Sequence, residues 1–116
     1  MSIERIEVGP RMSQAVVHGN TVYLAGQVAS GAPGKSVTEQ TKNILANIDA
    51  LLAKAGSDKT KILSTTIWLT DMGTFAEMNA VWESWIPAGH TPARATVESK
   101  LASPDYSVEI GMIVAK

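Results

Sequence analysis

The strongest folding signal in this chain is a capped amphipathic helix between Ser36 and Gly56. Ser36 is followed three residues later by Glu39, the capping-box pattern that begins a helix. Apolar residues then recur at spacings of three and four: Ile44, Leu45, Ile48, Leu51 and Leu52. That spacing places them on one helical face, and Gly56 suits the C-terminal cap. We therefore predict a helix over residues 37–55, with one face that other elements must cover.

Extended segments flank this helix on both sides. The runs 15–18 and 21–25 surround Gly19-Asn20, a composition typical of a two-residue hairpin turn. Alternation or β-branched content predicts further strands at residues 3–8, 62–69, 93–98 and 106–114. A second helix is predicted over residues 75–85, capped by Asp71 or Thr74. This order predicts a single α+β domain, residues 1–116, with two helices on one face of a mixed sheet.

The other face of that sheet has no element left to cover it. In the last strand, Val108, Ile110, Met112 and Val114 alternate with Glu109, Gly111, Ile113 and Ala115. The strand over residues 62–69 carries apolar groups on both of its faces. We therefore expect the second face to pack against another subunit.

Charge and composition exclude several classes of protein. Ten basic and eleven acidic residues give a net charge of −1, which argues against nucleic acid and against an anionic membrane as partner. The chain has no cysteine, and its two histidines, His18 and His90, lie far apart, so no metal site is expected. No signal peptide and no membrane-spanning run are evident, and we expect a cytoplasmic protein.

Arg94 is the first candidate for chemistry. It stands near the start of a run, residues 93–97, that otherwise has the composition of a buried strand. An arginine in a strand is ordinarily a salt-bridge partner or a surface residue, but here Glu98 is the only acid nearby. Pro92 restricts the backbone just before it. A guanidinium held in this way suits recognition of a carboxylate by two parallel hydrogen bonds.

Glu109 and Gly26 are the next candidates. Glu109 is either an outward-facing charge or, if the last two strands are neighbours, a carboxylate close to Arg94 that positions or deprotonates water. Gly26 follows a strand and either serves a turn or lets a ligand approach its backbone N–H. Weaker candidates are Ser13, Tyr23, Gln27, Asn79 and Thr96.

Several motifs together resemble one known family. They are the Gly19-Asn20 turn leading to Tyr23-Leu24-Ala25-Gly26-Gln27, the helix pair, Phe75-Ala76-Glu77-Met78-Asn79, Pro92-Ala93-Arg94 and Val108-Glu109-Ile110. Over essentially its whole length the chain resembles the Rid family, the reactive intermediate deaminases, also called the YjgF family.

The resemblance implies a fold like that of the bacillus-type chorismate mutase, assembled as a homotrimer whose sheets form a central barrel. It places the sites in clefts between subunits. It also implies hydrolysis of enamines and imines, such as 2-aminoacrylate and 2-iminobutyrate, to 2-keto acids and ammonia, without a cofactor. The partners implied are a small-molecule imine or keto acid and further copies of the chain.

The resemblance also assigns roles to individual residues. Arg94 matches the arginine that holds the substrate carboxylate, and Glu109 matches the glutamate that positions water. Gly26 matches the glycine whose N–H contributes to the site. The other matched positions, all near the substrate, are Met12, Ser13, Asn79 and Thr96. Met12 departs from the family, in which many members have tyrosine, so this side of the pocket differs.

Two other functions remain open at this point. The same cleft could sense keto or amino acids without turnover, which binding at Arg94 without rate acceleration would reveal. Some members of this family are described as endoribonucleases or translation inhibitors. The net charge of −1 and the lack of a basic run count against that reading.

Overall fold

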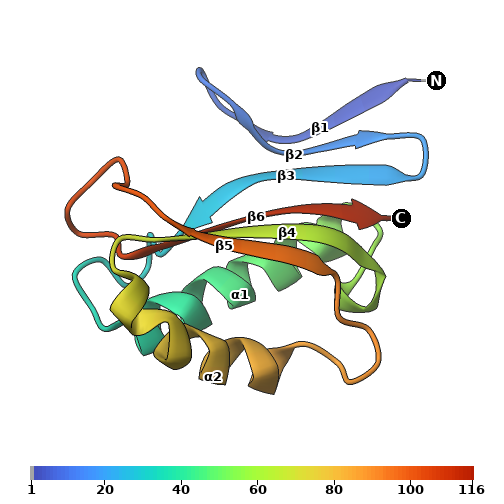
Figure 1. The fold of residues 1–116 in the computed structure, drawn as a ribbon. Helices are drawn as coiled ribbons and strands as arrows, with labels where there is room; N and C mark the ends of the chain where they lie inside the picture. The colour runs from blue at the N-terminus through green and yellow to red at the C-terminus, as the bar shows by residue number, and fades with distance from the viewer. Residues whose placement is uncertain (1) are drawn as a thin grey trace.

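The computed structural model describes residues 2–116, so Met1 of the expected domain lies outside the described residues. Six strands and two α-helices form the fold (Figure 1). The strands are β1 (Ile3–Val8), β2 (Ser13–His18), β3 (Thr21–Val28), β4 (Ile62–Leu69), β5 (Ala93–Glu98) and β6 (Val108–Ala115). The helices are α1 (Val37–Lys54) and α2 (Phe75–Trp85), with 3-10 turns at Lys59–Lys61 and Met72–Thr74.

All six strands belong to one mixed sheet in the order β1-β2-β3-β6-β4-β5. Only β4 and β5 run parallel, joined through α2, and every other neighbouring pair is antiparallel. The predicted hairpin is confirmed: His18 pairs with Thr21, and Gly19 has a φ of +60°. Glycine adopts that conformation without steric cost, which accounts for its place in the turn.

Helix α1 begins and ends where its caps predict. The Ser36 side chain accepts a hydrogen bond from the Glu39 N–H at 3.2 Å. At the other end Gly56 has a φ of +77°, and the Ser57 N–H donates to the Leu52 carbonyl at 2.9 Å. Helix α2 spans the predicted residues, 75–85.

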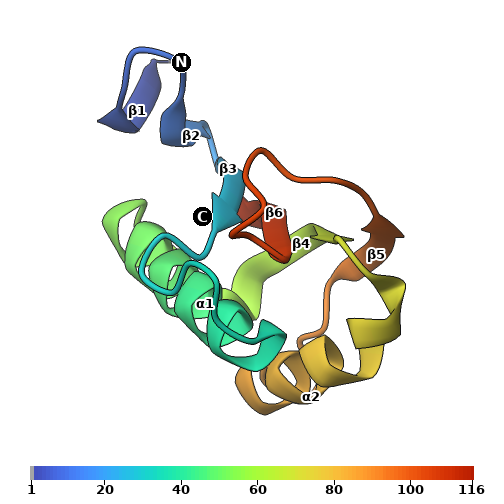
Figure 2. The same ribbon diagram turned by 90° about the vertical axis from the view of Figure 1, so that its left-hand side faces the viewer.

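Both helices cover the same face of the sheet, as Figure 2 shows. The core lies between them and the sheet, and the apolar face predicted for α1 is buried in it. The strand β6 presents Val108, Ile110, Met112 and Val114 to this core, as predicted. The expected α+β fold is therefore confirmed.

The second face of the sheet carries apolar side chains and is left open. Tyr23 of β3 pairs with Ile113 of β6, and both are more than a third exposed. Trp68 and Val97 continue this face across β4 and β5, paired directly opposite each other. We call this surface, formed by Tyr23, Trp68, Val97 and Ile113, the open face.

One expectation about a strand face needs correction. The residues flanking Arg94 were expected to be buried, but Ala93, Ala95 and Val97 are exposed because β5 is an edge strand whose second face has no cover. In β4 the register shifts between Ile62 and Ser64. The shift interrupts the alternation, so Ile62 is buried and Leu63 is exposed.

Candidate functional site

Arg94 lies on the edge strand β5 and points to the helix-covered side of the sheet. It pairs with Thr65 of β4, which is buried on that side. Its guanidinium carbon lies 5.4 Å from the ring centre of Trp82 and 5.9 Å from that of Phe75, both on α2. Cation–π attraction of this kind holds a guanidinium in a defined orientation.

Arg94 has no ion-pair partner among the described residues, 2–116. Among residues 2–116 the ion pairs are those of Lys54 with Glu7 and of Lys61 with Asp58. Burial lowers the pKa of Arg94, while the nearby charge of Glu83 acts in the opposite direction. An arginine stays protonated at neutral pH even so, because its ordinary pKa lies far above that range. The fixed cation is therefore available to an anionic ligand.

Two further predicted residues lie on the elements that position Arg94, the strand β5 and the helix α2. Thr96 follows on the same side of β5, and its hydroxyl is buried without a hydrogen-bond partner in the described chain. Asn79 is half-buried on α2 at four residues from Phe75 and three from Trp82, spacings that share one helical face. We call Arg94, Thr96 and Asn79, with the rings of Phe75 and Trp82, the arginine site.

Gly26 and Glu109 form a second group. The register between β3 and β6 shifts between Leu24 and Gln27, and Gly26 lies inside that irregularity. A Cβ built at Gly26 would lie 2.1 Å from Glu109 Oε2, so the carboxylate occupies the space that a side chain would need. Burial raises the pKa of Glu109. We call this pair the glycine–glutamate site.

The arginine site and the glycine–glutamate site do not meet within one chain. The last two strands were considered as neighbours that bring Glu109 beside Arg94, and this is wrong because β4 lies between them. Arg94 pairs with Thr65 of β4 and Glu109 with Trp68, three residues further along. Side chains alternate between faces along a strand, so Arg94 faces the helices while Glu109 faces the open side.

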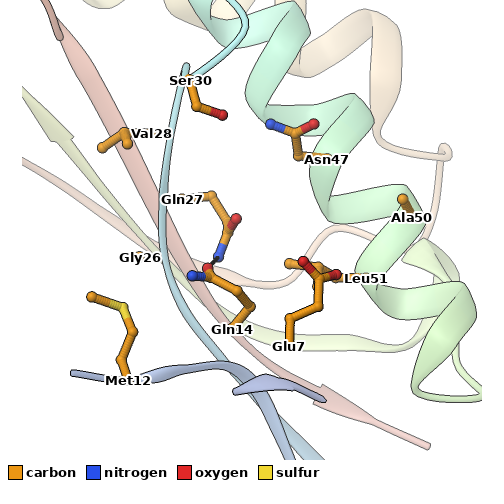
Figure 3. Close-up of a pocket in the computed structure, with 10 residues that line it drawn as sticks. All are labelled: Glu7, Met12, Gln14, Gly26, Gln27, Val28, Ser30, Asn47, Ala50 and Leu51. Carbon is orange, nitrogen blue, oxygen red and sulfur yellow. Dashed lines mark hydrogen bonds between the residues drawn. The ribbon is translucent and has the colours of Figure 1, made fainter. Parts of the chain in front are cut away.

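Ser13 is the first residue of β2, and Met12 directly precedes it. The Gly9 N–H donates to the Met12 carbonyl at 2.8 Å, which closes the tight connection from β1. Met12 is 53% exposed and lines a cavity of about 420 Å³ between β3 and α1 (Figure 3). Gly26 also lines it, whereas Ser13, Arg94 and Glu109 do not.

The same cavity contains polar residues that the sequence analysis did not single out. Gln14, Glu7 and Asn47 line it, together with Gln27, a weaker candidate (Figure 3). The register of the predicted hairpin could have indicated that Gln14 lies near Gln27. Because Ala15 pairs with Leu24, the preceding residue of β2 lies beside the segment that leads to Gln27. Asn47 and Glu7 reach the cavity through tertiary packing alone.

The structure also bears on metal binding and on membrane insertion. Within residues 2–116 no group of three or more His, Cys, Asp or Glu side chains is placed to hold a metal ion. Neither α1 nor α2, the α-helices of this described part, is long and apolar enough to cross a membrane.

These features define an α+β domain with a cationic site on one side of its sheet and a glycine–carboxylate pair on the other. Residues 2–116 match the family described as Endoribonuclease L-PSP. The RutC family protein YoaB of Escherichia coli K12 is 46% identical over 115 residues, which cover 99% of each chain.

Solved structures agree with this match. A member of the YjgF protein family from Neisseria meningitidis superposes with a TM-score of 0.96 at 46% identity, covering 100% of this chain and 96% of that one. A Rid family protein of unknown function from Yersinia pestis has a TM-score of 0.90 at 31% identity, covering 99% of this chain and 100% of that one. The chain therefore belongs to the Endoribonuclease L-PSP family, whose members also carry the names YjgF, RutC and Rid.

Proposed function

We propose that this protein is a cytoplasmic deaminase that hydrolyses 2-enamine and 2-imine acids to 2-keto acids and ammonia. The observation that carries the proposal is the guanidinium of Arg94, held over two aromatic rings and free of any carboxylate partner in the described chain. A preorganised, unpaired guanidinium binds a planar carboxylate with little loss of entropy. Every substrate of this class carries that carboxylate beside the reacting carbon.

The separation of the two sites supports an assembly in which one copy completes the site of another. In this proposal the chain forms a homotrimer, and Arg94, Thr96 and Asn79 of one copy face Gly26 and Glu109 of the next. The apolar open face supplies the surface that such an assembly would cover. Closed symmetric assemblies of identical chains are the common form for soluble oligomers.

The reaction needs few groups. An enamine first takes a proton at its terminal carbon and releases one from its nitrogen to water, which converts it to the imine. Water then adds to the imine carbon, a proton moves to nitrogen, and the carbon–nitrogen bond breaks to leave the keto acid and ammonia. Arg94 would hold the carboxylate, the Gly26 N–H would bind a second ligand oxygen, and Glu109 would orient the water and accept its proton.

The raised pKa of Glu109 supports this role. A carboxylate with a pKa closer to neutrality is a stronger base than an ordinary one.

The family description names an endoribonuclease, and the charge of this chain weighs against that activity here. Ten basic and eleven acidic residues provide no excess of cations for a phosphate backbone. RNA cleavage that disappears on stringent purification would come from a contaminant. RNA cleavage that persists in Arg94→Ala would show that the arginine site does not catalyse it.

The test generates 2-aminoacrylate or 2-iminobutyrate in place with a dehydratase and follows keto-acid formation. Wild type should accelerate it, Arg94→Ala should not, and Arg5→Ala, an exposed strand arginine on β1, should match wild type. Ligand binding at Arg94 without acceleration would favour the non-catalytic sensor. Near-normal activity of Arg94→Ala would overturn the assignment.

A further inference from the structure

The cavity between β3 and α1 is large for a three-carbon imine. Its volume of about 420 Å³ lies within the range of pockets that hold drug-sized ligands. Gly26, the residue proposed to contact the reacting end of the substrate, lines it. Gly26 has no side chain and borders both this cavity and, on the open side of the sheet, Glu109, so a substrate bound at its backbone could extend its side chain past Met12 into the cavity (Figure 3).

The side-chain amides of Gln27 and Gln14 form a hydrogen bond in the cavity, and its donor and acceptor can be assigned. Gln27 Nε2 donates to the Ala25 carbonyl at 2.9 Å and to Gln14 Oε1 at 3.0 Å. A backbone carbonyl only accepts, so the end of Gln27 that faces Ala25 is its NH₂ group. Gln14 therefore turns its oxygen toward Gln27. This leaves the Gln14 NH₂ and the Gln27 oxygen without partners among the described side chains, one donor and one acceptor.

The remaining lining is neutral overall. Glu7 carries a charge, but its Oε2 lies 2.8 Å from the Lys54 ammonium, which compensates it. Val28, Ala50 and Leu51 add an apolar wall. A neutral group that both donates and accepts fits this surface better than a cation or an anion, and a primary carboxamide presents both functions in one plane.

We propose that this cavity is the side-chain subsite of the deaminase and selects 2-imino acids whose side chain ends in a primary carboxamide. The inference rests on the proposed function. The amide carbonyl accepts from the Gln14 NH₂, and the amide NH₂ donates to the Gln27 oxygen, while the methylene groups of the substrate lie along the apolar wall. Met12 stands at the edge of the cavity.

The test compares three imines of matched length, generated by an L-amino-acid oxidase with catalase from glutamine, methionine and glutamate. A trapping agent competes with hydrolysis, so the loss of trapped imine reports the rate of the enzyme. We expect kcat/KM for the glutamine imine to exceed that for the methionine imine by about tenfold, because the apolar side chain leaves the amides of Gln14 and Gln27 unpaired. The glutamate imine should be the poorest substrate.

A single variant should change this preference. Gln14→Glu keeps the oxygen that accepts from Gln27 but replaces the free donor by an acceptor. We expect it to lose the preference for the glutamine imine and to gain turnover of the lysine imine. Asn20→Asp makes the same amide-to-acid change in the hairpin turn and should behave as wild type.

The outcomes separate the two proposals. Acceleration of 2-aminoacrylate hydrolysis with equal turnover of the glutamine and methionine imines overturns the subsite and leaves the deaminase intact. An unchanged preference in Gln14→Glu overturns the subsite as well. No acceleration of any imine overturns the proposed function, and the subsite with it.

Discussion

The carboxylate of Glu109 lies over the backbone of Gly26, in the space that any larger residue at position 26 would occupy. The separation of 2.1 Å between a built Cβ and Glu109 Oε2 is far below van der Waals contact, so one of the two must move. The conformation of Glu109 therefore depends on the absence of a side chain at Gly26. The residue type at position 26 therefore determines the position of the Glu109 carboxylate by steric exclusion and not by a hydrogen bond.

Gly26→Ala is expected to displace Glu109 and to lower kcat/KM for imine hydrolysis by about a hundredfold, the usual contribution of a positioned base. Overpacking should also lower the free energy of unfolding by about 1–3 kcal/mol. Steady-state kinetics and urea denaturation measure the two effects. Gly111→Ala is the matched control on the same face, because its Cβ would meet Trp68 at 3.4 Å, close to ordinary contact.

A double variant checks the cause. Glu109→Ala removes the colliding atoms, so adding Gly26→Ala to it should cost little further stability. Equal destabilisation by Gly26→Ala in both backgrounds would show that the collision is not the cause.

Stability should depend on pH through Glu109. Burial raises the pKa of its carboxyl in the folded state. Between the ordinary pKa and the raised one, the folded protein binds more protons than the unfolded chain, so the free energy of unfolding falls as pH rises through this window. Glu109→Gln should remove this component. Denaturation midpoints of both proteins across the acid range measure it, and parallel curves would contradict it.

Catalytic activity should also depend on the ionisation of Glu109, but it should rise with pH where the stability falls. If Glu109 acts as the base, kcat/KM increases as it ionises, so the acid limb of the wild-type profile should be displaced upward from the pH of an ordinary glutamate. In Glu109→Gln the residual activity should lack that limb. The two readouts together distinguish a base from a residue that only contributes to folding.

Local structure was predictable from this sequence, and the strand order was not. Helix α2 has the predicted residues and α1 differs by one, because caps and apolar spacing act over a few neighbouring residues. The placement of β4 between β5 and β6 is a non-local pairing that no short pattern encodes. The opposite orientations of Arg94 and Glu109 follow from that order, so the sequence predicted the site residues as candidates but not their separation.

Thr65→Val should leave stability unchanged or raise it by up to about 1 kcal/mol. The Thr65 hydroxyl is buried and has no hydrogen-bond partner in residues 2–116, so replacing it with a methyl group removes an uncompensated polar group. Thr41→Val is the matched control, because the Thr41 hydroxyl donates to the Val37 carbonyl at 2.7 Å inside α1. That variant should lose about 1 kcal/mol. Equal losses in the two variants, measured by thermal or urea denaturation, would contradict the difference.

Mixing two inactive variants should restore activity, because Arg94 and Glu109 face opposite sides of one sheet and are proposed to meet across copies. Arg94→Ala and Glu109→Ala subunits should each be inactive alone. When they are unfolded together and refolded in equal amounts, about a quarter of the interfaces join an intact arginine to an intact glutamate, so about a quarter of the wild-type activity should return.

The control pairs Arg94→Ala with the double variant Arg94→Ala/Glu109→Ala, where no copy supplies the arginine and no activity should return. Differently tagged subunits verify that mixed oligomers form. If they do form and the first mixture stays inactive, Arg94 and Glu109 do not act across an interface, and the assembled site is wrong. Recovery near a quarter supports a site in which one copy supplies Arg94 and the neighbouring copy supplies Glu109. A site completed within one chain could not be rescued by a second defective chain.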